Sequence, residues 1–566
     1  MARKLTELTK DELIAKIADL EDKLRKRYGL VWDREKEPEQ IVVDCERNVP
    51  VLQADKTKTI VNSGEDNILI EGDNYHALTC LNYTHQGKVD LIYIDPPYNT
   101  GAEDWKYNNN YVDKNDNFRH SKWLNMMEKR LLLAKRLLSE TGVLICAIDE
   151  NEQAPLGLLL QQIFNNMETH CITIVHNPRG VQGTNFSYTH EYAYFVIPQN
   201  KKSIGNRQIP KEEIKYSNLR NWGAESERTD AKNCFYPIIV EDGKVVGFGD
   251  VLKDDEHPKK QTESHGHQSW VYPMDIHGIE RKWRYARQTV ETIKHLLRAK
   301  KTKSGYEIEI GKDFGTYRTV WQDPRYDANE NGTKLINSIV PNAPFNFPKS
   351  LWNVYDCLYA AIGNKTDAVV VDFFAGSGTT GHAVLEMNKD GGHRRFILCT
   401  NNEGNICTDV CYPRLKGVIN GYKEGGKGQF VAGLGGNLTY YKTALIPVER
   451  IDKVTDRQRV EITQKAGTMI GLKESTLQET ELTEYYQIFT NHDKTRKTAI
   501  YFREDESKMN ELIKKLADAP TALYVFSYSK VDKEAYKELG KNIRVEDIPE
   551  PLLQIYKEIN LKIEDK

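Results

Sequence analysis

Nearly continuous apolar runs alternate with helix-length segments in two parts of the chain. Residues 67 to 95 have the pattern of a strand, a turn, a helix and a strand, in "NILIEGD", "NYHALTCL" and "KVDLIYID". A helix in "SKWLNMMEKRLLLAKRLLSETG", expected to end at Gly142, and a strand in "VLICAID" follow. The pattern resumes at "DAVVVDFFAGSGTTGHAVLEMN" and "RRFILCTNN". Strands that are apolar throughout and alternate with helices predict a parallel, doubly wound α/β sheet.

Changes in this pattern divide the chain. A polar, aromatic and irregular stretch interrupts the alternation, a Gly-rich connector follows its second part, and the tail alternates short strands with helices. We expect an N-terminal helical segment (1–40), a first α/β part (41–171), an inserted region (172–345), a second α/β part (346–420), a Gly-rich linker (421–437) and a small C-terminal α/β domain (438–566).

The N-terminal segment has the pattern of one amphipathic helix. Thr9 and Glu12 match a capping box, and Gly29 suits the opposite end. Leu13, Ile17, Leu20 and Leu24 form a single apolar stripe, although two heptads are too few to require a coiled coil. We therefore expect this helix to dock on the body of its own chain.

Composition and charge narrow the possible classes of protein. Hydrophobic residues make up 39% and charged residues 28%, as in ordinary globular domains, and no run approaches the roughly 20 apolar residues of a membrane span. With no signal-peptide core at the N-terminus, the prediction is a soluble, cytoplasmic protein without membrane contact. Nine scattered cysteines argue against a disulfide framework, and Cys399, Cys407 and Cys411 lack zinc-site spacing. At a net charge of −3, any binding of nucleic acid must use a local patch.

A glycine-rich motif, "VVVDFFAGSGTTG", joins a strand ending at Asp372 to a helix. Gly376, Gly378 and Gly381 have the G-x-G-x-x-G spacing that lets the backbone approach a ligand at the helix N-terminus. This motif alone suits a dinucleotide equally well, and a plain tight turn is a further alternative.

A second motif, "LIYIDPPYNTG", places Asp95, Pro96, Pro97 and Tyr98 at the end of a buried strand. A helix cap would explain the aspartate and one proline but would leave Tyr98 unused. A functional interpretation uses all four residues. The Asp95 carboxylate and the Pro96 carbonyl can each accept one N–H of a base amine, proline keeps the edge rigid, and Tyr98 offers a ring face to an unstacked base.

Together, "DPPY" and "DFFAGSG" resemble the amino-methyltransferases that modify DNA with S-adenosylmethionine. The catalytic motif precedes the cofactor loop, which is similar to the circularly permuted, β-class arrangement. Permutation is compatible with a doubly wound, Rossmann-like sheet because both motifs still reach the carboxyl edges of neighbouring strands. The resemblance therefore implies one active site built from two distant segments.

The resemblance also implies roles for particular residues. Thr400 stands where the family often has an acidic residue for the cofactor ribose, so Glu403 is the candidate substitute. "NFSYTHEYAYFV" is similar to the segment beside the flipped-base pocket, but His190 and Glu191 alone are expected to form a structural hydrogen-bonded pair. The cofactor-binding residues implied are Asp73, Lys349, Asp372, Phe374, Ala375, Gly376, Ser377, Gly378, Thr379 and Glu403.

A basic stretch in the inserted region is the candidate DNA contact. Residues 281–303 hold nine Lys or Arg against one Glu, interleaved with Trp283 and Tyr285, a composition that suits phosphate contacts. A solvated helix face is the alternative. The candidate DNA-binding residues are Arg281, Lys282, Arg284 and Arg287.

Longer blocks, "RNWGAESERTDAKNCFYPI" and "ERKWRYARQ", resemble the modification (Mod) subunits of type III restriction–modification systems. This resemblance implies double-stranded DNA as substrate, a homodimer, and docking of a helicase–nuclease restriction subunit. It also implies direct methyl transfer to the N6 amine of a flipped adenine, for which no metal is required. The alternatives are a cytosine-N4 or solitary methyltransferase, a catalytically silent recognition subunit, and a dinucleotide-dependent oxidoreductase.

Overall fold

The computed structural model describes residues 39–564 except 102–104, 109, 210, 211, 213, 504, 529–535 and 537–541, together with a few isolated positions before residue 39. The predicted N-terminal helix, with its cap at Thr9 and Glu12, therefore lies largely outside the described residues. The chain divides into two compact units. The main unit comprises Met1–Gly205 and Arg318–Lys566, and the inserted unit comprises Asn206–Tyr317.

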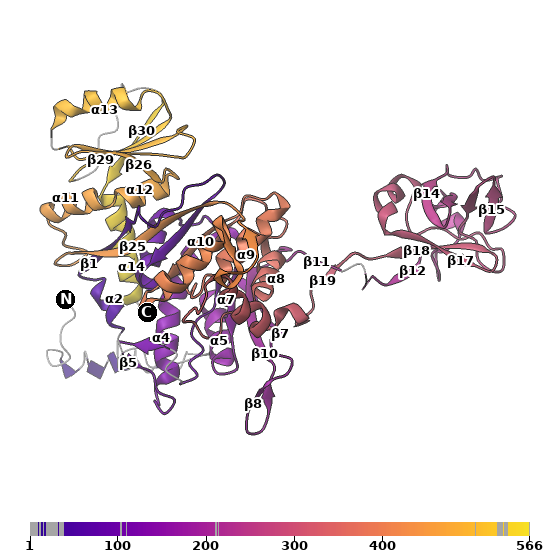
Figure 1. Ribbon diagram of the computed structural model, residues 1–566, viewed down its shortest axis with the longest axis horizontal. Helices are drawn as coiled ribbons and strands as arrows, with labels where there is room; N and C mark the ends of the chain where they lie inside the picture. Colours follow the sequence, from indigo (N-terminus) through magenta and orange to yellow (C-terminus); the bar gives the residue numbers. More distant parts are fainter. Residues whose placement is uncertain are drawn as a thin grey trace. The chain divides into compact units, whose positions relative to one another are not determined.

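A ten-stranded sheet forms the centre of the main unit, in the order β1-β25-β2-β22-β21-β3-β6-β10-β7-β20 (Figure 1). From β25 to β6 in this order, each strand is parallel to the next. Strand β10 is antiparallel to both β6 and β7, and β1 is antiparallel to β25. In chain order the strands are β1 (Asn48–Ala54), β2 (Asp66–Glu71), β3 (Val89–Ile94), β6 (Leu138–Ile148), β7 (Met167–Val175), β10 (His190–Pro198), β20 (Val320–Gln322), β21 (Val369–Asp372), β22 (Arg395–Thr400) and β25 (Asn437–Pro447).

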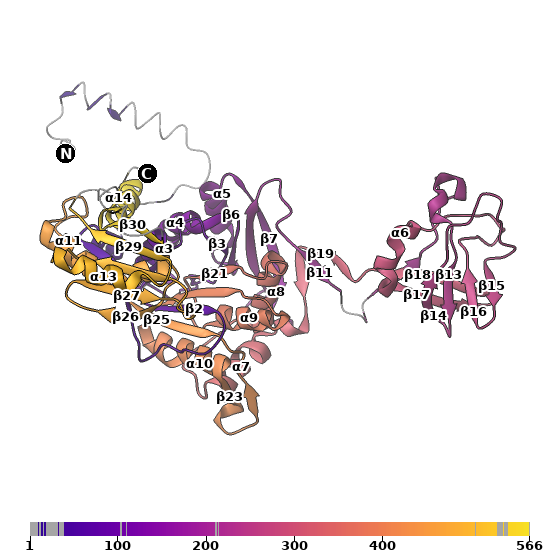
Figure 2. The same ribbon diagram turned by 90° about the horizontal axis from the view of Figure 1, so that it is seen from above.

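Helices cover both faces of this sheet, which explains why its strands are apolar throughout (Figure 2). One layer holds α3 (Asn74–Thr84), α4 (Arg119–Leu137) and α5 (Gln153–Ile163), and the other holds α8 (Leu351–Ile362), α9 (Thr379–Met387) and α10 (Tyr412–Asn420). Buried strand residues such as Ile92, Ile94 and Val371 belong to one apolar core with helix residues such as Leu78 and Leu131. The predicted doubly wound α/β fold is confirmed.

The prediction that Gly142 ends a helix was wrong. Helix α4 ends at Leu137 and is followed directly by β6, which contains Gly142. A Cβ atom at residue 142 would lie only 2.8 Å from the Val89 carbonyl oxygen. This glycine thus permits close approach of β3 to β6 instead of terminating the helix.

The inserted unit covers fewer residues than the region 172–345 that the sequence suggested, because β7, β10 and β20 join the main sheet. Its core is apolar and includes Leu219, Tyr236, Ile238 and Trp283. Two small sheets pack there, in the orders β14-β13-β16-β15 and β12-β18-β17. The strands are β12 (Tyr216–Asn218), β13 (Ile238–Glu241), β14 (Lys244–Phe248), β15 (Thr262–His265), β16 (Gln268–Val271), β17 (Leu297–Thr302) and β18 (Gly305–Gly311).

The tail forms a second sheet, in the order β26-β27-β28-β29-β30, after its first strand β25 has joined the main sheet. Helices α12 (Gly467–Lys473) and α14 (Glu550–Glu564) both contact α3, and the Tyr556 hydroxyl donates to the Pro50 carbonyl at 2.8 Å. The strands are β26 (Gln478–Leu482), β27 (Tyr486–Thr490), β28 (Lys497–Tyr501), β29 (Thr521–Phe526) and β30 (Ile543–Ile548), and the other helices are α11 (Asp456–Lys465) and α13 (Met509–Leu516).

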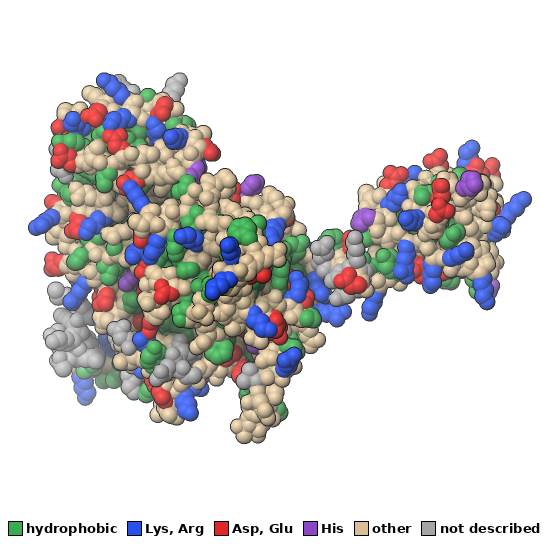
Figure 3. All heavy atoms as spheres, viewed as in Figure 1, with side chains coloured by type: hydrophobic (Ala, Val, Ile, Leu, Met, Phe, Trp, Pro, Cys, Tyr) green, Lys and Arg blue, Asp and Glu red, His purple; other side chains and the backbone are tan. Residues whose placement is uncertain are grey.

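The predicted linker 421–437 contains a short hairpin of β23 (Gly421–Lys423) and β24 (Phe430–Ala432). On the face shown in Figure 3, the basic side chains of the main unit are interspersed with acidic ones. Within the described residues, no helix combines the length and the apolar character needed to cross a membrane.

Candidate active site

Two neighbouring parallel strands, β21 and β3, end at the same edge of the main sheet. Asp372 is the last residue of β21, and Asp95 directly follows β3. From β21 the chain crosses through α9 to β22 on one side, whereas from β3 it crosses through α4 to β6 on the other. In open α/β sheets, ligands bind outside the carboxyl ends of the strands at such a switch of direction, and both sequence motifs lie there.

The Asp372 carboxylate stabilises the glycine-rich loop through two hydrogen bonds. The Phe374 amide donates to Asp372 Oδ1 at 2.9 Å, and the Thr380 hydroxyl donates to Oδ2 at 2.6 Å. Gly376 and Gly378 have φ values of 50° and 78°, a conformation that glycine adopts without strain. Burial of Asp372 raises its pKa to about 7. The loop therefore depends on the Asp372 carboxylate and on two glycines in a left-handed conformation.

Arg414 is a further support of this loop that sequence reasoning missed. Its guanidinium, fully buried on α10, donates to Ser377 Oγ at 3.1 Å and to Thr379 Oγ1 at 2.8 Å. Burial lowers the pKa of Arg414 to about 10. No spacing rule links residue 414 to the motif, because the contact depends on how α10 packs against α9.

Asp95 has one carboxylate oxygen without a donor among the described residues. Its side chain remains 28% exposed, but the Oδ1 atom is buried and accepts no hydrogen bond from any of them. Burial raises the pKa of Asp95, and the nearby Lys349 ammonium opposes that rise only in part. The Trp123 indole donates to the Pro97 carbonyl at 2.7 Å and so fixes the turn that carries Asp95. A buried acceptor without a donor is costly, so it is suited to a substrate N–H.

Lys349 brings three of the site's side chains together. Its ammonium contacts Glu191 Oε2 and the Tyr98 hydroxyl, and it lies 3.4 Å from Asp95 Oδ1. The Tyr98 hydroxyl also donates to Glu191 Oε2 at 3.2 Å, and Asn353 Nδ2 donates to Oε1 at 2.7 Å. Although burial opposes both charges, the Asp95 and Glu191 carboxylates raise the pKa of Lys349, and the Lys349 ammonium lowers the pKa of Glu191.

His190 and Glu191 do not form the structural pair that the sequence suggested. Glu191 is buried against Lys349, whereas the His190 ring packs edge-on against Tyr192 with the ring centroids 5.2 Å apart. Successive side chains of a strand point to opposite faces, so the two residues of β10 have separate surroundings. The available signal for Glu191 was a carboxylate within the apolar strand "HEYAYFVI".

The segment after Tyr98 is fixed by a buried polar chain. Asn99, at a positive φ of 59°, donates to Glu152 Oε1 at 2.5 Å and accepts from the Trp105 indole at 2.9 Å. His120 Nδ1 lies 2.6 Å from the same Glu152 oxygen. These contacts hold Asn99, the residue directly after Tyr98, in place.

The remaining predicted cofactor residues lie at the ends of neighbouring elements. Asp73 caps α3 by accepting from the Tyr75 amide at 2.7 Å, and the next residue, Asn74, donates to the Phe373 carbonyl at 3.1 Å. Glu403, beyond the end of β22, forms an ion pair with Lys106. Their cofactor roles stay predictions.

The predicted DNA-binding residues of the inserted unit are partly engaged within that unit. Arg281 pairs with Asp275 at 3.0 Å, and Arg287 donates to the Gly249 carbonyl at 2.6 Å. Arg284 is exposed and contacts the Ser217 hydroxyl at 3.2 Å, while Lys282 is half-buried. Trp283, which is interleaved with these basic residues in the sequence, is a core residue of the inserted unit.

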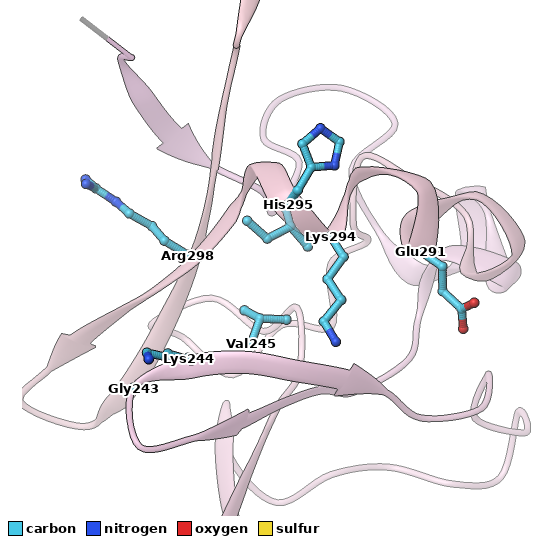
Figure 4. Close-up of a pocket in the computed structure, with 8 residues that line it drawn as sticks. Gly243, Lys244, Val245, Glu291, Lys294, His295 and Arg298 are labelled. Atoms are coloured by element: carbon cyan, nitrogen blue, oxygen red, sulfur yellow. The ribbon is translucent and has the colours of Figure 1, made fainter. Parts of the chain in front are cut away.

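The inserted unit also has an open groove of about 570 Å³ whose charged lining residues are mainly basic (Figure 4). Its lining includes Lys244, Lys294, His295 and Arg298, against one carboxylate, Glu291. Glu291 pairs with Arg287 and Arg298 pairs with Glu309. Lys244 and Lys294 have no carboxylate partner among the described residues, although the Lys294 ammonium donates to the Val246 carbonyl at 2.6 Å. Their positive charges are therefore not neutralised within the described part of this groove.

Comparison with known proteins identifies a family model described as DNA methylase (N6_N4_Mtase), which matches residues 89–409. The EcoPI Mod subunit of Escherichia phage P1 is 29% identical over 404 residues, covering 62% of this chain and 60% of that protein. The type II methyltransferase M.KpnI of Klebsiella pneumoniae is 30% identical over 362 residues, covering 60% and 82%. The StyLTI Mod subunit of Salmonella typhimurium is 30% identical over 431 residues, covering 70% and 60%. The chain thus spans less than two thirds of either Mod subunit.

Proposed function

The chain belongs to the DNA methylase family, and we propose that it transfers a methyl group from S-adenosylmethionine to the N6 amine of a flipped adenine in double-stranded DNA. The observation that carries this proposal is the buried Asp95 Oδ1 atom, which lacks a donor among the described residues at the sheet edge it shares with the glycine-rich loop. Adenine is favoured over cytosine by the resemblance of "DPPY" to adenine-specific members.

The glycine-rich loop fits the proposed cofactor. The backbone is left-handed at Gly376 and Gly378, a conformation that residues with side chains adopt only with strain. A Cβ at residue 378 would also lie 3.0 Å from Cys411 Sγ. The backbone from Phe374 to Thr379, with Asp73 nearby in the fold, would hold the cofactor. When bound, S-adenosylmethionine supplies a methyl group on a sulfonium centre.

The chain's own residues position and activate the amine. Asp95 Oδ1 accepts one N–H and the Pro96 carbonyl accepts the other, which draws the nitrogen lone pair out of conjugation with the ring. Tyr98 supports the base on its ring face. As the new N–C bond forms and the S–C bond breaks, the surplus amine proton passes to the Asp95 carboxylate, whose raised pKa makes it a better base.

The chain is proposed to act as the modification subunit of a type III restriction–modification system, as a homodimer that docks a helicase–nuclease subunit. Similarity to two Mod subunits over about 400 residues supports this assignment. The inserted region is proposed to recognise the DNA sequence.

A methyl-transfer assay tests the activity. Full-length protein is incubated with DNA and S-adenosylmethionine labelled in the methyl group, the DNA is digested, and the labelled nucleoside is identified. We expect N6-methyldeoxyadenosine at one short site, located by sequencing DNA from a methylation-free host that expresses the chain. Labelled N4-methyldeoxycytidine would overturn the base assignment, and no label at all would overturn the function.

The groove of the inserted unit gives a prediction about DNA affinity. Lys244→Gln with Lys294→Gln removes two positive charges from this groove. We expect about tenfold weaker binding to DNA of any sequence, and a slope of log K against log salt that is smaller by up to about 2. Fluorescence anisotropy at several salt concentrations measures both quantities.

Lys232→Gln is the matched control, because this exposed lysine of the same unit already pairs with Asp254 at 2.5 Å. Its affinity and salt slope should match the parent. An unchanged slope in the double variant would remove this groove from the DNA contact.

A further inference from the structure

Glu191 and Lys349 form a buried ion pair directly beside the proposed catalytic carboxylate. The side chains are 5% and 13% exposed, respectively. A buried ion pair needs a reason, since apolar residues of similar size usually stabilise a fold as well or better. The pair touches Tyr98 and lies next to Asp95, so the reason is to be sought in the reaction.

The Lys349 ammonium has two carboxylates within reach but is not shared equally between them. It contacts Glu191 Oε2 directly, whereas its nitrogen is 3.4 Å from Asp95 Oδ1, an oxygen that accepts no hydrogen bond from the described residues. Glu191 is itself fixed from the opposite side by Asn353 of α8, whose amide donates to Oε1 at 2.7 Å. Lys349 therefore makes its closer contact with the anchored Glu191, and its ion pair with Asp95 is the longer of the two.

We propose that Glu191 is a positioning residue that keeps Lys349 from hydrogen-bonding to Asp95, so that the Asp95 Oδ1 atom can accept the target amine. The inference deepens the proposed methyl transfer and rests on it. Without the Glu191 charge, Asp95 is the remaining carboxylate next to Lys349. A charge-assisted hydrogen bond from the ammonium then occupies the oxygen that the amine requires.

Glu191 also orients Tyr98. The Tyr98 hydroxyl donates to Glu191 Oε2 and accepts from Lys349, and the ammonium lies 4.7 Å from the centroid of the Tyr98 ring. One acidic side chain thus sets both the hydrogen-bonding edge and the aromatic surface that the base would meet. Glu191 need not lie close to the target amine, because it acts through Lys349 and Tyr98.

A single variant and a double variant test this role. Glu191→Gln keeps the size and the acceptor for Asn353 but removes the charge, and we expect kcat to fall about 100-fold with the dissociation constant for S-adenosylmethionine within about threefold. Lys349→Met added to Glu191→Gln removes the competing ammonium. We expect kcat of the double variant to exceed that of Glu191→Gln at least tenfold, since Asp95 is free again.

The matched control is Glu168→Gln, an exposed carboxylate on the adjacent strand β7, which should keep the parent's kcat. The double variant removes both buried charges at once, so its folding, followed by thermal unfolding, should not suffer. A double variant no faster than Glu191→Gln overturns the inference. If the parent itself transfers no methyl group, the proposed function has failed instead, and the two failures are distinguishable.

Discussion

Asp95→Asn is expected to lower kcat for methyl transfer about 1,000-fold while the dissociation constant for S-adenosylmethionine stays within about threefold. Asparagine keeps the size of the side chain and one acceptor, but it loses the charge and cannot take the proton. Asp95 Oδ1 is a buried oxygen that accepts no hydrogen bond from the described residues, and the Lys349 ammonium lies 3.4 Å from it. Loss of the Asp95 charge therefore affects the transition state of methyl transfer more than binding of the cofactor.

Labelled methyl transfer under single-turnover conditions measures the rate, and calorimetry measures cofactor binding. Glu140→Gln is the matched control, because this exposed carboxylate lies on the neighbouring strand β6, toward the opposite edge of the sheet. It should behave as the parent does. An Asp95→Asn protein that methylates DNA at the parent's rate would contradict the proposed chemistry.

The rate in the parent should also depend on pH in a defined direction. Because burial raises the pKa of Asp95, the carboxyl becomes protonated at a higher pH than an exposed aspartate would. A protonated carboxyl is a poor acceptor and no base. Methyl transfer should therefore decline as the pH falls through this raised pKa, and Asp95→Asn should remove that part of the profile.

Gly378→Ala is expected to weaken binding of S-adenosylmethionine at least about 30-fold, the second large effect. Gly378 has a φ of 78° at the start of α9, and an added Cβ would lie 3.0 Å from Cys411 Sγ. The substitution therefore strains the backbone and presses on Cys411, the residue just before α10, so the loop shifts where it must approach the cofactor. Calorimetric titration of the cofactor checks this result.

Gly391→Ala is the control that distinguishes a changed shape of the cofactor loop from a general loss of stability through backbone strain. Gly391, beyond the end of the same helix α9, has a φ of 87°, and a Cβ there would meet no atom within 4 Å. Both variants should lose about 1 kcal/mol of folding free energy. The Gly391→Ala protein alone should keep the parent's cofactor affinity, and equal losses in both variants would assign the effect to stability.

The doubly wound fold was predictable because a strand covered on both faces must be apolar along its whole length. Residues 91–94 and 369–371 satisfy this condition, and they became the adjacent strands β3 and β21. The membership of β7 and β10 in the same sheet was not predictable. Their neighbours are irregular loops, and strand pairing between distant segments leaves no periodic signal in the sequence.

The two motifs were predictable as parts of one site, since parallel strands bring their carboxyl ends to one edge. The ion pair of Glu191 and Lys349 was not. Lys349 was assigned to the cofactor and Glu191 to a structural pair, and residues 158 positions apart meet here by tertiary packing alone. Arg414 was missed for the same reason.

Strand β25 has a consequence for dissecting the protein into parts. It lies between β1 and β2, so residues 437–447 are an interior strand of the catalytic sheet although they follow the Gly-rich segment. A truncated chain that stops within 421–437 would retain both motifs yet expose the edge of β2 and leave β1 without its partner. Separate expression of a catalytic module therefore has to include β25, and the contact of Tyr556 with Pro50 favours retaining α14 as well.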